Sequence, residues 1–289
     1  MTVGDLVQIS AVKAWCGVTT TADDALLAAL ITQISRGIYN YINRSFVLPQ
    51  NVVETYDGND QRQLLLRNWP VGAVSSLMIN GEVVPPAPPL SANAPPQPGF
   101  VLESSDDQPP GAMQQLFLRG RYRFHKGRQN VAVAYRAGYE IVAEARTIPA
   151  QAPYQLVAFS PFGNWAQDTG VAYAGGGALA AVTPAVNPNP PAQDPAPLIA
   201  GQYAVDPLSG TYSFSADDAG AAVTLSYGYI PADLEQCALE WVADRYRYKD
   251  RIGLSSKSLG GQETAAYQNR SVPDFVALAL TNFRRIIAN

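Results

Sequence analysis

Residues that could perform acid–base, nucleophilic or metal chemistry are few in this sequence of 289 residues. His125 is the only histidine, and it lies between Phe124 and Lys126 in a predicted turn. A Ser-His-Asp or Cys-His arrangement would depend on this one side chain. The two cysteines, Cys16 and Cys237, lie far apart in helical patterns and match no disulfide framework or zinc spacing, so we interpret both as core residues. The sequence predicts no catalytic, cofactor-binding or metal site.

Two acidic pairs and one glycine run also fail to define a site. Asp106-Asp107 and Asp217-Asp218 lie in polar, turn-like segments, and adjacent residues of a strand point to opposite faces. The second pair also lacks calcium-loop spacing. Gly175-Gly176-Gly177 is not followed by the Lys-Ser/Thr of a phosphate-binding loop and is predicted to be a turn. We therefore expect a protein that is not an enzyme and needs no cofactor.

The composition favours turn-rich β structure and argues against tight nucleic-acid binding. Charged residues make up 15% of the chain, below the usual value of about 25%, and Gly and Pro contribute 23 residues each. The net charge is −4, and residues 141–229 hold six acidic residues with Arg146 as their only base. Loose passage of DNA remains compatible with this charge. No long apolar run or signal-like start occurs, so we expect a soluble protein, made in a reducing cytoplasm, without a membrane partner.

Helical periodicity marks both ends of the chain. Apolar residues recur every three or four positions from Asp23 to Asn43, and Thr21 with Asp24 resembles a capping box. A shorter helix is predicted with Ser10 as its N-cap and Gly17 as its C-terminal stop, and further helices begin at Pro231 and Pro273. The positions predicted to face inward on these three helices are Val12, Trp15, Cys16, Leu234, Cys237, Ala238, Trp241, Phe275, Val276, Ala279, Phe283 and Ile287.

Alternating patterns between these ends predict strands. We expect a hairpin from Val52 to Leu66, a strand from Val74 to Ile79 before the turn Asn80-Gly81, and a second hairpin of residues 115–124 and 130–135. Residues 85–98 hold seven prolines and are predicted to form a loop. Short strands from 154 to 229 predict a small β-sandwich or barrel, interrupted by a second proline-rich loop at 184–197.

A short internal repeat indicates that this second β region is an insertion. Ile148-Pro149-Ala150 recurs as Ile230-Pro231-Ala232, each time after a strand end that contains Gly-Tyr. The predicted fold class is α+β, with a helical hairpin and C-terminal helices packed with an antiparallel β-sheet, plus an inserted all-β domain. The predicted core comprises residues 1–149 and 230–289, and the insert comprises residues 150–229.

Four strings, in this order, resemble the head-tail connector (adaptor, or head completion) proteins of long-tailed double-stranded DNA phages. They are Asp24 to Phe46, Glu54-Thr55-Tyr56-Asp57-Gly58, Leu64-Leu65-Leu66-Arg67-Asn68-Trp69-Pro70-Val71, and Asn130 to Tyr139. The resemblance covers roughly residues 5–140 and 230–287. The residue 85–98 loop and the 150–229 insert depart from the family pattern and inherit no function from it.

The resemblance implies a structural virion protein of the neck, located between capsid and tail. It implies a homo-oligomeric ring, commonly of twelve subunits, that binds the portal protein and the next neck or tail-completion protein. Double-stranded DNA would pass through the lumen without sequence-specific contacts.

Three groups of residues are candidate contact surfaces. One group of five basic residues would contact DNA in the lumen or a neighbouring subunit: Arg119, Arg121, Arg123, Lys126 and Arg128. Alternation places Arg119, Arg121 and Arg123 on one strand face. The alternative is that this is an ordinary solvated face. Arg245, Arg247, Lys249 and Arg251 would either complement the C-terminal end of a helix or contact the portal. Lys257, Arg284 and Arg285 are further candidates for portal or neck contacts, although the terminal segment with Arg284 and Arg285 would alternatively close the chain's own helical bundle. The polar segment 255–270 would either become ordered on assembly or be an ordinary mobile loop.

An alternative function is a phage tail or baseplate binding module whose β insert recognises a host-surface glycan. Its aromatic side chains would bind the sugar or, on the other interpretation, form the core of the sandwich. They are Tyr154, Phe159, Phe162, Trp165, Tyr173, Tyr203, Tyr212 and Tyr227.

Overall fold

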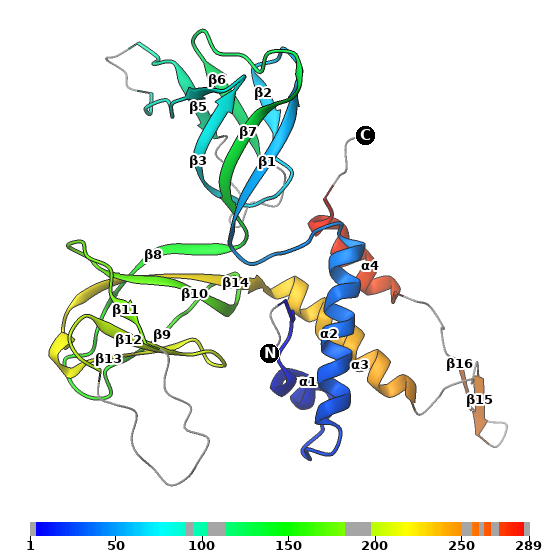
Figure 1. The fold of residues 1–289 in the computed structure, drawn as a ribbon. Coiled ribbons are helices and arrows are strands. Elements are labelled where there is room, and N and C mark those ends of the chain that lie inside the picture. Colours follow the sequence, from blue (N-terminus) through cyan, green and yellow to red (C-terminus); the bar gives the residue numbers. More distant parts are fainter. Residues whose placement is uncertain are drawn as a thin grey trace. The chain divides into compact units, whose positions relative to one another are not determined.

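The structure is a computed structural model that describes residues 4–90, 95–102, 114–182, 198–249, 256–259, 263–266 and 272–285. The chain divides into two compact units, one made of residues 1–46 and 231–289 and the other of residues 47–230. The first unit holds the α-helices, and the second holds most of the strands (Figure 1). The predicted mixture of helices and antiparallel sheets is confirmed. The separation of an insert at 150–229 from the remaining core stays a prediction.

The helical unit contains, within its described residues, four α-helices. They are α1 (Ile9–Cys16), α2 (Asp24–Tyr41), α3 (Ala232–Tyr248) and α4 (Asp274–Leu280). Helix α2 buries Leu27, Ile31, Ile34 and Ile38, the apolar series that its sequence spacing predicts. Helix α3 packs closely on α2, because a Cβ atom added to Gly37 would lie only 3.3 Å from the Trp241 ring. Leu234, Cys237, Ala238 and Trp241 are buried as predicted.

Several details of the helix ends and faces differ from the predictions. Helix α1 begins at Ile9 after Gln8, so Ser10 is not its N-cap, whereas Gly17 ends the helix as predicted and has a left-handed conformation at φ 71°. The Thr21–Asp24 capping box does not form, because Asp23 is the N-cap and makes no side-chain cap hydrogen bond. Trp15 is 51% exposed and Phe275 is 53% exposed, so neither faces inward. Their helices are short, and the helical period alone does not predict how much of a helix surface is covered by neighbouring elements. Ile287 lies outside the described residues.

The first part of the strand unit is an antiparallel sheet of four strands in the order β1-β7-β3-β4. Its strands are β1 (Gln50–Gly58), β7 (Gly127–Ala137), β3 (Val71–Ile79) and β4 (Glu82–Val84). The predicted turn at Asn80-Gly81 joins β3 and β4. Strand β7 is central, so the segment Asn130 to Tyr135 has partners on both sides.

A smaller sheet has the order β2-β6-β5, with β2 (Gln63–Leu65), β6 (Gln115–Arg119) and β5 (Gly99–Leu102). Both predicted hairpins are wrong, because β1 pairs with β7 and β2 pairs with β6. Alternation identifies strands but does not specify their partners, which are set by contacts between distant residues. Pro86 of the predicted proline-rich loop forms a parallel bridge to Phe100, so part of this loop joins the two sheets.

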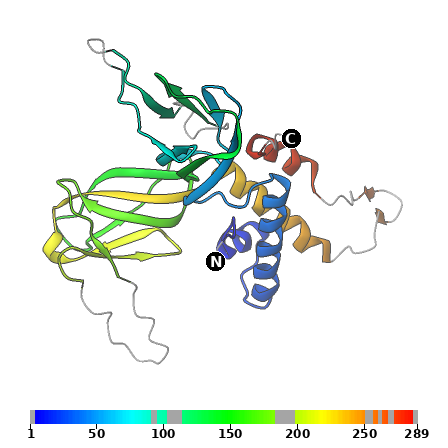
Figure 2. The same ribbon diagram turned by 45° about the horizontal axis from the view of Figure 1, so that its top comes forward.

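The second part of the strand unit consists of two further sheets, seen as two layers in Figures 1 and 2. One has the order β10-β14-β8, from β10 (Gly163–Tyr173), β14 (Ala222–Pro231) and β8 (Glu140–Thr147). The other has the order β11-β12-β13-β9, from β11 (Ala180–Ala181), β12 (Gln202–Asp206), β13 (Thr211–Phe214) and β9 (Gln155–Val157). Strand β8 was not predicted, and it pairs with β14.

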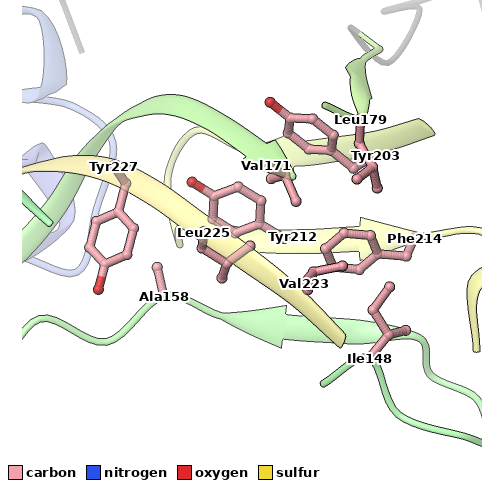
Figure 3. Close-up of a cluster of buried hydrophobic side chains, with 10 residues drawn as sticks. All are labelled: Ile148, Ala158, Val171, Leu179, Tyr203, Tyr212, Phe214, Val223, Leu225 and Tyr227. Carbon is pink, nitrogen blue, oxygen red and sulfur yellow. The ribbon is translucent and has the colours of Figure 1, made fainter. Parts of the chain in front are cut away.

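These two sheets share a hydrophobic core (Figure 3). Val223, Leu225 and Tyr227 of β14 point into it from one sheet, and Tyr212 and Phe214 of β13 point into it from the other. The alternating burial of β13 and β14 follows the period of two that the sequence predicts.

Two predicted loops fall wholly or partly outside the described residues. The proline-rich loop at 184–197 is not described, and of the segment 255–270 only β15 (Ser256–Leu259) and β16 (Glu263–Ala266) are described. These two strands pair antiparallel with each other.

Candidate functional sites

The five basic residues of the segment 119–128, here called the basic segment, do not share a strand face. Arg119 ends β6, Arg121 and Arg123 lie in the connection, and Arg128 lies in β7. The chain turns at Gly120, which has φ 73° and packs against Pro98, where an added Cβ atom would lie 2.6 Å from the proline Cβ. The predicted alternation of Arg119, Arg121 and Arg123 on one face is therefore wrong.

The cations of the basic segment are available to an anionic partner. Arg121, Arg123, Lys126 and Arg128 are exposed, and the half-buried Arg119 donates a hydrogen bond of 3.2 Å to the Pro88 carbonyl. Within the part of the chain that the structure describes, none of the four ion pairs includes a member of the segment. Buried Phe124, which bridges to Gln61, anchors the segment to the sheet. His125 is exposed, and its carbonyl oxygen accepts a hydrogen bond from Asn130.

The basic residues of α3 occupy different environments. Lys249 contacts Asp23 of the α2 N-terminus at 3.1 Å, and Asp23 also accepts a hydrogen bond from the Tyr246 hydroxyl. These two donors, Tyr246 first, lower the pKa of Asp23 below its usual value. Lys249 therefore links two helices of its own unit. Arg247 is exposed, and Arg251 lies outside the described residues.

The remaining basic candidates, Arg284, Arg285 and Lys257, also differ in their surroundings. Arg285 donates its backbone N–H to the Ile42 carbonyl at 2.8 Å, which ties the chain to the end of α2. Arg284 is exposed. The backbone of Lys257 belongs to β15, and its side chain is outside the described part of the structure.

A hydrogen-bonded network that sequence patterns did not predict centres on Glu54. Its carboxylate accepts hydrogen bonds from the Tyr56 and Tyr135 hydroxyls and from the side-chain amide of Asn68, at 2.7 Å from Tyr135 and 3.0 Å from Asn68. The Tyr56 hydroxyl also accepts from the backbone N–H of Arg67 at 3.1 Å. Burial and the hydrogen bond to Glu54 raise the pKa of Tyr135 to about 12, and the same two causes raise the pKa of Tyr56. The network therefore gathers two tyrosine hydroxyls and an asparagine amide on one carboxyl group.

The network joins three of the strings that carry the family resemblance. Glu54 and Tyr56 come from Glu54-Thr55-Tyr56-Asp57-Gly58, Asn68 follows Leu64 to Arg67, and Tyr135 lies in the strand Asn130 to Tyr135. Gly58, from the same string as Glu54, lies against the basic segment, because an added Cβ atom would be 1.8 Å from the His125 carbonyl oxygen. In the sequence, only the order of the strings drew attention to these residues. That order did not predict that their side chains are in contact.

Carboxylates in the sandwich accept hydrogen bonds from tyrosines. Asp168 accepts from Tyr203 at 2.7 Å and from Tyr212 at 3.0 Å. Asp218 accepts from Tyr173 at 2.6 Å, and Glu144 accepts from Tyr227 at 2.8 Å. Several of the acidic residues in this region thus act as hydrogen-bond acceptors for buried or partly buried tyrosines.

The aromatic residues that could bind a glycan are mostly core residues. Tyr203, Tyr212 and Tyr227 are buried, and Tyr154, Trp165 and Tyr173 pack against the same core. Phe162 lies against the ring of Tyr229 at 6.1 Å between centroids. Phe159, which is 68% exposed, is the clear exception among these aromatics.

The described residues contain no group of three or more His, Cys, Asp or Glu side chains that could hold a metal ion. Within the same residues, none of the helices is both long enough and apolar enough to cross a membrane.

Comparison with known proteins supports a phage assembly role. A family model described as "Head completion protein" matches residues 5–91, and no curated protein matches the chain. The matched segment runs from before α1 to beyond β4 and includes Glu54, Tyr56 and Asn68. The resemblance to phage head completion and connector proteins is confirmed.

This family is structural and not enzymatic, and its members act where head and tail are joined. The match therefore implies, without establishing it for the whole chain, a virion component at the head–tail junction that interacts with other head or tail proteins.

Proposed function

We propose that this chain is the subunit of a ring-forming connector that joins the portal to the next neck or tail-completion protein. The observation that carries the proposal is the network around Glu54, which unites three separate strings of the connector family in one structural unit. The head completion match over residues 5–91 supports the same role. The protein would be made in the host bacterial cytoplasm and would reside in the neck of the virion.

A homo-oligomeric ring is the assembly expected of such a subunit, and the resemblance suggests twelve copies. Each copy would contact two neighbours through two different patches, because a heterologous interface closes only by rotation about the ring axis. Double-stranded DNA would pass through the lumen without sequence specificity. The basic segment is suited to brief contacts with phosphates, because its cations are not neutralised by ion pairs among the described residues.

Contacts with the portal are expected at basic side chains that do not stabilise their own unit. Arg247 and Arg284 are exposed and meet this condition, whereas Lys249 pairs with Asp23. We therefore favour Arg247 and Arg284 over Lys249 as portal or neck contacts. Arg285 is a weaker candidate because its backbone closes the helical unit.

The glycan-binding alternative receives little support from the sandwich. A sugar-binding platform presents aromatic faces to solvent, but Tyr203, Tyr212 and Tyr227 are buried. Their hydroxyl groups are also hydrogen bonded to Asp168 or Glu144.

Electron microscopy of the purified chain, alone and mixed with its portal protein, tests the connector proposal. Closed rings that stack coaxially on the portal are the expected result. A chain that never associates with portal particles, yet is retained on immobilised host-surface glycan, would contradict it and favour the binding module. Phage that lack the protein should accumulate DNA-filled heads separate from tails.

A further inference from the structure

The side chain of Asn130, near the start of β7, joins three separate pieces of the chain. Its Oδ1 accepts a hydrogen bond of 2.9 Å from the backbone N–H of Gly58, at the end of β1. Its Nδ2 donates to Asn80 Oδ1 at 2.9 Å, in the turn between β3 and β4, and to the His125 carbonyl oxygen at 2.8 Å. Because an amide both donates and accepts, this one group ties the basic segment to β1 and to the β3–β4 turn.

Two glycines provide the space that the Asn130 amide occupies. A Cβ atom added to Gly127 would lie 2.7 Å from Asn130 Cγ and 2.8 Å from its Nδ2, and one added to Gly58 would lie 3.0 Å from its Oδ1. Neither glycine has a positive φ, so close packing, and not a left-handed backbone, accounts for glycine at both positions. The segments that the amide joins are therefore packed directly around it.

The basic segment is fixed at its centre. The backbone N–H of buried Phe124 donates to the Gln61 carbonyl at 2.9 Å, and the Phe124 carbonyl accepts from the Asp60 N–H at 2.7 Å. His125, the next residue, accepts the hydrogen bond from Asn130. Four exposed cations lie within three residues of this fixed pair: Arg121, Arg123, Lys126 and Arg128.

A fixed backbone favours a partner whose charges are regularly spaced. Phosphates follow one another at regular intervals along DNA, and a protein gains affinity with each phosphate that it neutralises. A loop that is already ordered loses little conformational freedom when it binds, so more of the interaction energy contributes to affinity. The ties of the basic segment should therefore strengthen its contact with DNA.

We propose that Asn130 is a positioning residue, which holds the basic segment in a preformed arrangement for contact with the phosphates of double-stranded DNA. This inference rests on the proposed function, which supplies DNA as the partner, and it adds the residue through which the cations are arranged. Asn130 acts through these cations, so its contribution to DNA affinity exists only while they are present.

Fluorescence anisotropy with a double-stranded DNA fragment tests this role, at low salt and at a temperature where circular dichroism shows every variant to be folded. Asn130→Ala leaves the net charge unchanged and should weaken binding roughly five- to tenfold, because the segment must then become ordered on binding. Gly127→Ala displaces the same amide and should have a similar effect. It provides the test if Asn130→Ala does not fold.

Asn80→Gly is the matched control within the same network. It removes the hydrogen bond from the amide to the β3–β4 turn but retains the one to His125. Glycine accepts the φ of 53° at this position, and DNA binding should stay within about twofold of the unmodified chain.

A double-mutant cycle separates positioning from a general effect on the sheet. Its second background is the chain in which Arg121, Arg123 and Lys126 are replaced by glutamine. In that background Asn130→Ala should cause little further loss of DNA affinity, because most of the cations that it arranges are gone. A purely structural role would give the same loss in both backgrounds.

Four results would overturn the inference: an unmodified chain that does not bind DNA, folded Asn130→Ala and Gly127→Ala chains with unchanged affinity, equal weakening by Asn80→Gly, or an equal loss in the glutamine background. None of these results affects the connector function if the chain still forms rings on the portal. A chain that gives the expected cycle but never associates with portal particles would remove the connector function alone.

Discussion

The backbone N–H of Tyr229 donates a hydrogen bond of 3.1 Å to the carbonyl oxygen of Tyr139, and their rings meet edge-to-face with centroids 5.8 Å apart. Each tyrosine follows a glycine, and both glycines pack against the same short stretch of chain. A Cβ atom on Gly138 would lie 2.5 Å from the Leu48 carbonyl, and one on Gly228 would lie 2.5 Å from the Pro49 side chain. The paired Gly-Tyr strand ends in the sequence thus converge at one junction, where the chain enters and leaves the sandwich.

This junction predicts that the sandwich can be removed cleanly. Joining Tyr139 directly to Tyr229, with loss of residues 140–228, requires only a small movement because their backbones are already hydrogen bonded. We expect the shortened chain to retain a cooperative thermal transition by circular dichroism and a single species on gel filtration.

A deletion of residues 150–229 is the matched comparison. It would leave β8 (Glu140–Thr147) without its partner β14, and an unpaired exposed strand promotes aggregation. We expect this chain to aggregate or to melt without cooperativity. Equal behaviour of the two deletions would contradict the assignment of the junction to Tyr139 and Tyr229.

Gly58 is predicted to tolerate no side chain. The Cβ atom of Gly58→Ala would lie 1.8 Å from the His125 carbonyl oxygen, at the point where the pairing of β1 with β7 shifts register. The backbone must move to accommodate it, and we expect a loss of about 3 kcal/mol or more in the free energy of unfolding. Chemical denaturation followed by fluorescence measures this value.

Gly72 provides the control for this substitution. It also lies in a strand of the same sheet, but its Cβ atom would have only the Arg136 carbonyl nearby, at 4.0 Å. Gly72→Ala should change stability by less than about 1 kcal/mol. If Gly58→Ala were equally mild, the close approach to His125 would not constrain the sheet.

Glu54 is predicted to be the residue of the network most sensitive to truncation. Glu54→Ala removes the acceptor of Tyr56, Tyr135 and Asn68 together. Because hydrogen bonds to a charged group contribute about 1.5–3 kcal/mol each but are not additive, we expect a loss of about 2–4 kcal/mol. Thr55→Ala changes an exposed neighbour and should cost much less. Urea unfolding that shows equal losses for the two variants would contradict a central role for the carboxylate.

The sequence predicted the long helix and the buried faces of α2 and α3 because their apolar periods are regular over many residues. It did not predict that β1 pairs with β7, because alternation is the same whichever strand is the partner. It also missed β8, whose exposure pattern includes two adjacent exposed residues, Val142 and Ala143, next to a register shift. Ala143 has φ 55°, a local conformation that no simple alternation encodes.

The candidate contacts were predicted only as far as residue type allows. Basic residues at 119–128 are readable in the sequence, but Gly120 redirects the chain and distributes them over a strand, a turn and the start of another strand. Lys249 resembled Arg247 in the sequence, yet Lys249 pairs with Asp23, which lies more than two hundred residues earlier. Such long-range pairs are set by helix packing and leave no local pattern.

The cations of the basic segment are predicted to supply weak, nonspecific DNA binding. Replacing Arg121, Arg123 and Lys126 with glutamine should reduce retention of a double-stranded DNA fragment at low salt. The slope of the logarithm of the binding constant against the logarithm of salt concentration should become shallower by roughly 0.9 for each phosphate that the variant no longer neutralises. Fluorescence anisotropy measures both quantities.

The double variant Arg247→Gln, Arg284→Gln removes cations elsewhere, and it should retain the original slope. An unchanged slope in the triple variant would exclude the segment as a DNA-binding surface.

Asp23 is predicted to make the helical unit sensitive to acid. Hydrogen bonds from Tyr246 and Lys249 hold its pKa below the usual value, so folding favours the ionised carboxylate. The resulting stabilisation is present above the unfolded pKa of about 4 and is lost as the pH falls through the lower folded value. Asp23→Asn should therefore be less stable than the unmodified chain near pH 7, and the difference should shrink toward zero near pH 2. Urea unfolding at several pH values, followed by circular dichroism at a wavelength that reports helix, measures the difference. Asp217→Asn is the control, because Asp217 is an exposed carboxylate of the other unit without an ion pair among the described residues. A difference for Asp23→Asn that stays constant with pH would show that Asp23 acts through the shape of its side chain and not through its charge.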